Sequence, residues 1–221
     1  MNEYTKKQSV VGIIVLAAMA IVSFTNLFAA NLSSAAIILG IVIFFVCQAV
    51  EKQPMQGSGL DFKAIGKGLK DKKIWIWLIM PIVMDAVCVL LSVLFLPEYI
   101  EYEPARAGSF VVIEISAKSL LMFLVFALGE EIAWRAFFQN RLSKILPIIP
   151  AVLVTSFLFT LGHYKQGDMT IVLFGLVFTF INSILYGIIF HKAKNAWIST
   201  TSHFAANIFE VLLFILIAKV N

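Results

Sequence analysis

The sequence predicts an all-α bundle of about seven transmembrane helices. Of its 221 residues, 61% are hydrophobic and only 14% are charged, whereas about a quarter of the residues in soluble domains are charged. Apolar stretches recur along the whole chain, and most have the ~20 residues that an α-helix needs to cross a bilayer. This pattern is typical of a multi-pass integral membrane protein, and we expect it in a bacterial cell membrane.

Seven stretches have the length and hydropathy of membrane spans. They are residues 10–29, 33–50, 74–95, 111–140, 148–164, 169–190 and 196–218. The first is longer than the apolar core of a signal peptide, ~7–15 residues, and another apolar stretch follows it at once. We therefore expect the first span to be retained. The fourth span is the longest, so it must tilt or extend beyond the bilayer.

The basic residues predict a cytoplasmic N-terminus. They concentrate before the first span and in the second, fourth and sixth connections. These residues are Lys6, Lys7, Lys52, Lys63, Lys67, Lys70, Lys72, Lys73, Arg141, Lys144, Lys192 and Lys194. The other side has only Arg106, Lys165 and Lys219, and its longest loop is acidic. Because positively charged loops stay in the cytoplasm, the C-terminus is expected outside.

The second connection has a pattern of its own. Apolar residues at positions 60, 62, 65 and 69 alternate with lysines. That spacing fits a short amphipathic helix on the cytoplasmic leaflet, which would make membrane lipid a partner. A plain solvated loop fits almost as well, and neither interpretation discriminates between functions.

We expect one membrane-embedded domain over residues 1–221. Residues 1–110 contain no recognisable motif, whereas residues 111–218 contain the residues expected to form a catalytic core. The net charge of +4 comes from basic residues between apolar stretches, which indicates contact with anionic lipid rather than with nucleic acid. Cys47 and Cys88 lie within apolar stretches and are expected to be buried thiols, without a disulfide.

Two adjacent acidic residues, Glu130 and Glu131, lie inside an apolar stretch, followed by Arg135. An acidic residue at the centre of a membrane helix costs roughly 2.5 to 3.5 kcal/mol, so these residues need a compensating role. Glu131 and Arg135 are four residues apart and can form an ion pair on one helix face. Glu130 points about 100° away around an α-helix, which makes it the better candidate for proton transfer.

Two histidines and an asparagine also lie in apolar stretches. His163 lies near the end of the fifth span, while His203 and Asn207 share one face of the seventh span. A carboxylate and an imidazole can deprotonate water, and a second imidazole with a carboxamide can stabilise an oxyanion. Helix capping and hydrogen bonding between helices are the alternative roles. Depths counted along the helices agree for Glu130, His203 and Asn207, whereas His163 is expected to lie deeper.

Three motifs resemble those of the CAAX-protease and bacteriocin-processing family of intramembrane proteases, also called the Abi family. The segment Glu130-Glu131-Ile-Ala-Trp-Arg135 is similar to Glu-Glu-x-x-x-Arg. The segments Phe159-Thr-Leu-Gly-His163 and His203-Phe-Ala-Ala-Asn207 are similar to Phe-x-x-x-His and His-x-x-x-Asn. Their order also fits, so the resemblance covers the chain from the fourth span onward.

This resemblance implies an endopeptidase that acts on a membrane-associated protein or peptide. A prenylated CAAX protein, a bacteriocin leader and a peptide pheromone all fit as substrates. The resemblance implies Glu130 as the base, His163 as a second group that activates water, and His203 with Asn207 as the oxyanion donors.

Glu131 and Arg135 are implied to support that site. The family is commonly labelled a metalloprotease family, and a metal-free glutamate mechanism is also proposed for it. The sequence lacks the usual zinc spacings, such as His-Glu-x-x-His. Glu130, His163 and His203 are nevertheless chemically able to hold Zn²⁺, so both mechanisms stay open.

Two other classes of function remain as alternatives. A non-catalytic membrane scaffold or a bacteriocin immunity protein would use the polar residues for helix packing or partner binding. A proton-coupled transporter would use the further intramembrane acids Asp85 and Glu210, although the chain has no internal repeat of the kind that transporters show. We expect Asp85 and Glu210 to form hydrogen bonds between helices.

Overall fold

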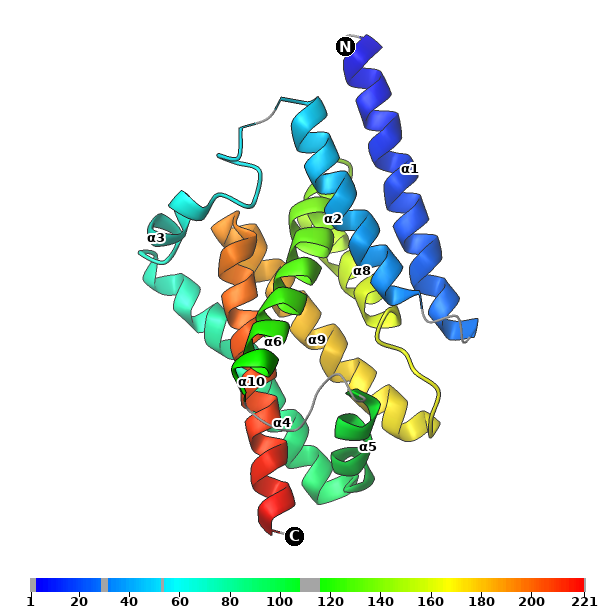
Figure 1. The fold of residues 1–221 in the computed structure, drawn as a ribbon, viewed down its shortest axis with the longest axis vertical. Coiled ribbons are helices and arrows are strands. Elements are labelled where there is room, and N and C mark those ends of the chain that lie inside the picture. The colour runs from blue at the N-terminus through cyan, green and yellow to red at the C-terminus, as the bar shows by residue number, and fades with distance from the viewer. Residues whose placement is uncertain (1–2, 29–31, 53, 108–115, 221) are drawn as a thin grey trace.

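The computed structural model describes residues 3–28, 32–52, 54–107 and 116–220, and all regular structure among them is helical (Figure 1). The N-terminal elements are α1 (Glu3–Thr25), η1 (Asn26–Phe28), α2 (Ser33–Val50), η2 (Phe62–Ala64), α3 (Ile65–Gly68), α4 (Lys72–Phe95) and α5 (Glu98–Ala107). The C-terminal elements are α6 (Ala117–Glu130), η4 (Glu131–Gln139), α7 (Asn140–Leu142), α8 (Ile148–Leu161), α9 (Met169–Ala193) and α10 (Ala196–Val220). The predicted all-α class is confirmed.

Four of these helices are long and apolar enough to cross a membrane: α2, α4, α9 and residues 196–217 of α10. They correspond to the predicted spans two, three, six and seven, and α2 has the predicted bounds. Residues 12–28 and helix α8 are apolar but shorter. The predicted fourth span begins at position 111, outside the described residues, and its described part is divided among α6, η4 and α7. The count of about seven spans and the orientation of the N-terminus stay predictions.

Apolar side chains are exposed and polar side chains are buried on this bundle to an extent that is unusual for a soluble protein. Large apolar side chains are exposed on the outer helices, such as Ile76 on α4, Leu121 on α6 and Ile149 on α8. Polar and charged side chains, including Glu131 and Arg135, are buried instead. An exposed apolar surface of this extent marks a membrane or protein contact, and it fits helices that face lipid.

The element at the centre of the bundle, η4, is a π-helix rather than the α-helix that was predicted up to position 140. All nine of its residues are buried. Its apolar side chains, such as Phe137, pack in the main hydrophobic cluster with Met19 of α1, Phe44 of α2 and Leu158 of α8. π-Helical segments are rare and frequently lie at functional sites.

Helix α10 connects the parts of the bundle that carry the predicted motifs. It packs against α4, α6, α9 and η4. Its first half lies near η4 in the middle of the bundle, whereas its C-terminal end lies far from the start of α1 (Figure 1). Of the two motif residues of α10, His203 is buried and Asn207 is half-buried.

The contact between α2 and η4 depends on the absence of a side chain at Gly40. A Cβ atom there would lie 2.7 Å from Ala133 Cβ and 3.0 Å from Ala133 Cα. We expect Gly40→Ala to lower the free energy of unfolding by about 1–3 kcal/mol, because overpacking forces the two helices apart. Unfolding in detergent or bicelles measures this change.

Gly12 of α1 is the matched control, because a Cβ atom there would have no neighbour within 4 Å. Gly12→Ala should leave stability unchanged or raise it by up to about 1 kcal/mol, the difference in helix propensity. Equal effects of the two substitutions would show that α2 and η4 are not in close contact.

Candidate active site

The four residues predicted to be catalytic line one cavity of about 310 Å³. Glu130 comes from the end of α6, His163 follows α8, and His203 and Asn207 come from α10. These residues are separated by up to 77 positions in the sequence, and only the packing of the bundle brings them together. The structure therefore gathers the predicted residues around one space, as a shared water or substrate requires.

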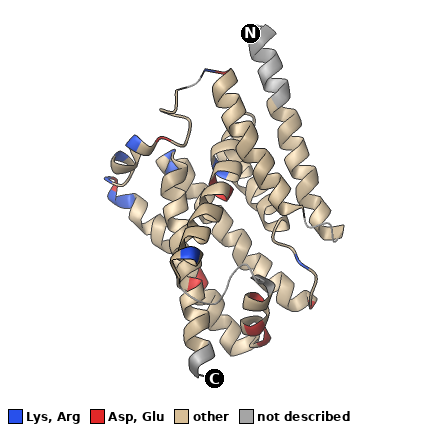
Figure 2. Cartoon of the chain, viewed as in Figure 1, with Lys and Arg blue, Asp and Glu red and all other residues tan. Residues whose placement is uncertain are grey.

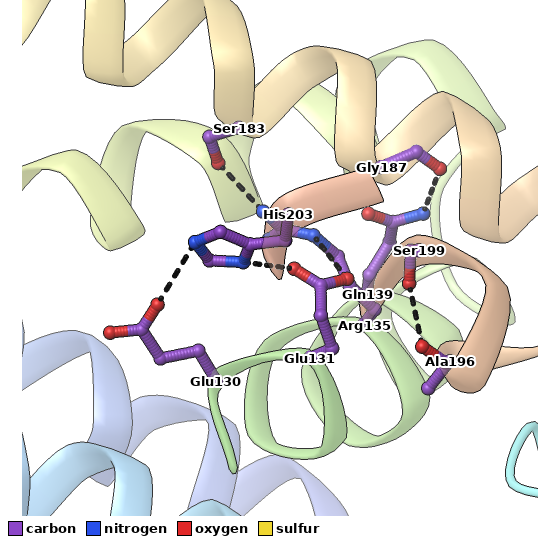
Figure 3. Close-up of polar contacts among 9 residues, drawn as sticks. All are labelled: Glu130, Glu131, Arg135, Gln139, Ser183, Gly187, Ala196, Ser199 and His203. Atoms are coloured by element: carbon purple, nitrogen blue, oxygen red, sulfur yellow. Dashed lines mark hydrogen bonds and ion pairs between the residues drawn. The ribbon is translucent and has the colours of Figure 1, made fainter. Parts of the chain in front are cut away.

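The two adjacent glutamates contact the two ring nitrogens of one histidine (Figure 3). Glu130 Oε2 lies 3.6 Å from His203 Nε2, and Glu131 Oε1 lies 3.2 Å from His203 Nδ1. The side chain of Glu130 is 16% exposed and lines the cavity, whereas that of Glu131 is 0% exposed. Glu130 can therefore meet water or substrate, and Glu131 can act only through its protein neighbours.

Arg135 neutralises the buried charge of Glu131. Its Nε lies 3.6 Å from Glu131 Oε2, and both side chains are fully buried, as the predicted pairing requires. Its terminal Nη2 donates a 3.0 Å hydrogen bond to Ser183 Oγ on α9. One turn later, Gln139 Nε2 donates to the carbonyl oxygen of Gly187. These two hydrogen bonds connect η4 to α9.

Aromatic rings fix the positions of the charged groups. The ring of Tyr186 stacks on His203, with centroids 4.3 Å apart and planes inclined by 17°. The guanidinium of Arg135 lies 5.0 Å from the centroid of the Phe159 ring, a favourable cation–π geometry. Phe159 also contacts the ring of His163, at 4.5 Å between centroids. Aromatic rings therefore pack against both histidines.

His163 lies at the cavity because α8 is shorter than the predicted fifth span. The helix ends at Leu161, and His163 belongs to the turn that follows. Its Nδ1 lies 3.0 Å from the carbonyl oxygen of Phe159. The sequence predicted that His163 lies deeper in the membrane than Glu130. In the structure both residues line the same cavity, because α8 ends before His163.

Asn207 follows His203 by one turn of α10 and lines the cavity beside it. Within the part of the chain that the structure describes, its carboxamide makes no hydrogen bond. The partly buried carboxamide is therefore available to a ligand, and its N–H groups can donate to an oxygen atom held near His203.

The cavity extends away from the two histidines toward further acidic side chains. Asp85 and Glu210 line this part, and Asp85 Oδ1 accepts a 2.6 Å hydrogen bond from Asn182 Nδ2. The prediction that Asp85 bonds between helices is confirmed, because Asp85 is in α4 and Asn182 is in α9. Cys88 also lines the cavity, and both it and Cys47 are free thiols.

The described residues do not fit the zinc site that the sequence left open. Among them, no group of three or more His, Cys, Asp or Glu side chains is placed to hold a metal ion. His203 Nδ1 faces Glu131, and His163 Nδ1 faces a backbone carbonyl. Glu130, His163 and His203 thus share the cavity without converging on one ligand position.

Several residues of this site were not identified from the sequence. They are Tyr186, which stacks on His203, and the polar partners Gln139, Asn182 and Ser183. The signal for the α9 residues was the pair Asn182-Ser183 in an otherwise apolar stretch. Polar residues in membrane helices commonly face another helix, but the sequence does not specify which one.

Comparison with known proteins gives one family match. Residues 113–209 match the family model described as type II CAAX prenyl endopeptidase Rce1-like. This match covers less than half of the chain, and it supports the CAAX-protease and bacteriocin-processing family that the three motifs resemble. No curated protein and no solved structure matches the chain.

The match includes all seven motif residues, from Glu130 to Asn207. It supports a peptidase of the CAAX type that is embedded in the membrane. Helices α1, α2 and α4 lie before the matched residues, although α2 packs on η4 and α4 on α10. The N-terminal helices therefore support the site of the family without belonging to the matched part.

The buried ion pair should dominate the stability of this site. Arg135→Met leaves the Glu131 carboxylate without its cation, and we expect the free energy of unfolding to fall by about 3–5 kcal/mol. Unfolding of the purified protein in bicelles measures the loss.

Arg141→Met is the matched control, because Arg141 pairs with Glu51 where their side chains are 22% and 14% exposed. That loss should be about 1 kcal/mol or less, since water solvates the remaining charge. A smaller loss at position 135 than at position 141 would contradict the description of the site.

Proposed function

We propose that the protein is an intramembrane endopeptidase in which Glu130 activates the attacking water. The observation that carries this proposal is the shared cavity, which one carboxylate, two imidazoles and one carboxamide line together. Such a set contains a base, its partner and two hydrogen-bond donors, as amide hydrolysis requires. The family match supports the same class of reaction.

In this mechanism the water molecule sits between Glu130 and His163. Glu130 takes one proton while the water oxygen attacks the carbonyl carbon of the scissile peptide bond. The carbon–nitrogen bond then breaks, and Glu130 returns that proton to the leaving nitrogen. The products are a new carboxylic acid and a new amine, and transfer of the acid's proton to the amine gives a carboxylate and an ammonium group.

The oxyanion that forms during the attack is stabilised from α10. Glu131 holds the His203 ring through Nδ1, so that an N–H at Nε2 would point into the cavity and donate to the oxyanion. The Asn207 carboxamide, one turn further, donates a second hydrogen bond to the same oxygen. Donors that are already oriented need little rearrangement in the transition state, and Glu131 and Tyr186 hold His203 in this orientation.

The proposed substrate is a membrane-associated protein or peptide. A CAAX-type tail, a bacteriocin leader and a peptide pheromone all meet this description. The alternative, a non-catalytic scaffold or immunity protein, accounts for the buried pair of Glu131 and Arg135. It gives no reason for Glu130 and Asn207 to face an open cavity.

Substitution of the proposed base tests the function. We expect Glu130→Gln to lower kcat/KM by about 10²–10⁴-fold, the usual contribution of a general base, while the fold is retained. Purified protein, a panel of fluorogenic CAAX and leader peptides, and mass spectrometry of the products provide the measurement.

Glu101→Gln is the control, because Glu101 is exposed on α5 and does not line the cavity. Its activity should equal that of the unmodified chain. Unchanged cleavage by the Glu130 variant would end the assignment, as would an unchanged biological phenotype with normal expression.

The oxyanion donor has a separate test. Asn207→Ala should lower kcat by about 10²–10³-fold, with little change in KM, because the hydrogen bond forms only in the transition state. A rise in KM alone would show that Asn207 binds the substrate and does not stabilise the oxyanion.

A further inference from the structure

A basic segment connects α2 to α4 at one end of the bundle. We call residues 59–73 the basic strap; it contains η2, α3 and the first two residues of α4. Five of its lysines are exposed: Lys63, Lys67, Lys70, Lys72 and Lys73. Figure 2 shows basic residues gathered on and beside α3, whereas acidic residues gather on α5 at the far end.

The acidic residues of the strap do not cancel this charge by ion pairing with it. Asp61 and Asp71 each accept a hydrogen bond from a backbone N–H, of Lys63 and Lys73 respectively. They serve as N-caps of η2 and α4. The strap therefore has an excess of exposed positive charge.

The strap lies at the level where membrane spans end. The apolar helices α4 and α10 begin beside it, and α9 ends there. Two aromatic side chains are also exposed at this level, Phe62 (70%) and Trp75 (50%). Exposed aromatic rings beside lysines are typical of segments that bind the headgroup region of an anionic bilayer.

The strap is attached to the first turn of α10 by three hydrogen bonds. Ala196 N–H donates to the carbonyl oxygen of Gly59 at 2.6 Å. The Asn195 carboxamide donates to the Asp61 carbonyl at 2.7 Å, and Trp197 Nε1–H donates to the Leu60 carbonyl at 3.3 Å. The Trp197 ring also contacts Phe62 edge to face. A shift of the strap must therefore shift the start of α10.

The same turn of α10 is packed against α3 from the other side. Ile198 is 1% exposed and packs with Ile65 and Leu69 of the strap. A Cβ atom on Gly68 would lie 2.4 Å from Ile198 Cδ1, so α3 rests directly on this side chain. His203 follows Ala196 by seven residues, about two turns of the same helix.

We infer that the basic strap binds the phosphate headgroups of anionic phospholipids. Bound lipid holds the strap, and through it the first turn of α10 and His203. The coupling of bound lipid to His203 rests on the proposed function, whereas lipid binding by the strap does not. Free phosphate has the same chemistry, but exposed lysines spread over residues 63–73 and two exposed aromatic rings suit a lipid surface better than one ion.

The test uses the full-length protein in nanodiscs of phosphatidylcholine, with and without phosphatidylglycerol. Hydrogen exchange of residues 59–73 and 195–203 and the rate of peptide cleavage are measured in both. Phosphatidylglycerol should slow exchange in both segments and raise the cleavage rate.

The triple variant K63Q, K67Q and K70Q tests the role of charge. Each lysine near an anionic surface contributes roughly five-fold in affinity, so this variant should need at least about tenfold more anionic lipid for the same slowing of exchange.

Two control variants separate charge from attachment. The triple variant K63R, K67R and K70R retains the charge and should respond to lipid like the unmodified chain. Trp197→Phe removes the hydrogen bond to Leu60 but retains a ring against Phe62. It should retain the lipid effect on residues 59–73 and weaken the effect on residues 195–203 and on cleavage.

Several outcomes would overturn the inference. One is a rate of exchange in residues 59–73 that is the same with and without phosphatidylglycerol. A second is an effect of phosphatidylglycerol on this rate that is equally large in the unmodified chain and in the triple glutamine variant. Another is equal protection by inorganic phosphate or by an acidic peptide in phosphatidylcholine discs, which would assign the surface to that ligand instead. A different outcome is slower exchange of residues 59–73 with phosphatidylglycerol but no peptide cleavage under any condition. That result would agree with lipid binding by the basic strap and would contradict the proposed function.

Discussion

A fully buried carboxylate at position 131 imposes the main constraint on this protein. A charge removed from water is strongly destabilising unless an opposite charge and hydrogen bonds compensate for it. Arg135 provides the charge, and His203 from α10 provides a ring nitrogen. Arg135 in turn requires Ser183 of α9. The contacts that compensate this one buried charge thus connect η4, α9 and α10.

The same constraint gives two adjacent glutamates different roles. Glu131 is enclosed on every side, so it can orient His203 but cannot meet a substrate. Glu130 faces the cavity from the other side of the imidazole. The change from α-helix to π-helix occurs between these two residues. This combination, an orienting acid and an accessible acid around one imidazole, is the physical basis of the proposed catalytic site.

Local patterns were sufficient to predict part of this arrangement. Hydropathy and length gave the helical class and the bounds of α2, and the spacing of four residues gave the contact between Glu131 and Arg135. The π-helix could not be predicted, because an apolar stretch read at 3.6 residues per turn looks the same for both helix types. Tyr186 was missed because an aromatic residue in an apolar helix gives no signal until the tertiary structure places it on His203.

The ends of the helices show a second limit of sequence patterns. Apolar stretches of similar composition become helices of different length: α9 has 25 residues, whereas α8 has 14. The early end of α8 leaves His163 in a turn at the cavity, although the apolar pattern continues to it. Where a helix ends thus depends on contacts between helices as well as on local hydropathy.

The position of His203 between the two glutamates can be measured directly by nitrogen NMR of the histidine rings. The chain has only three histidines, so single substitutions assign each signal. We expect a protonated His203 Nδ1 whose resonance shifts strongly in Glu131→Gln, while the ring signals of His163 stay unchanged. A His203 ring that does not respond to that substitution, or an Nδ1 without a proton, would contradict it.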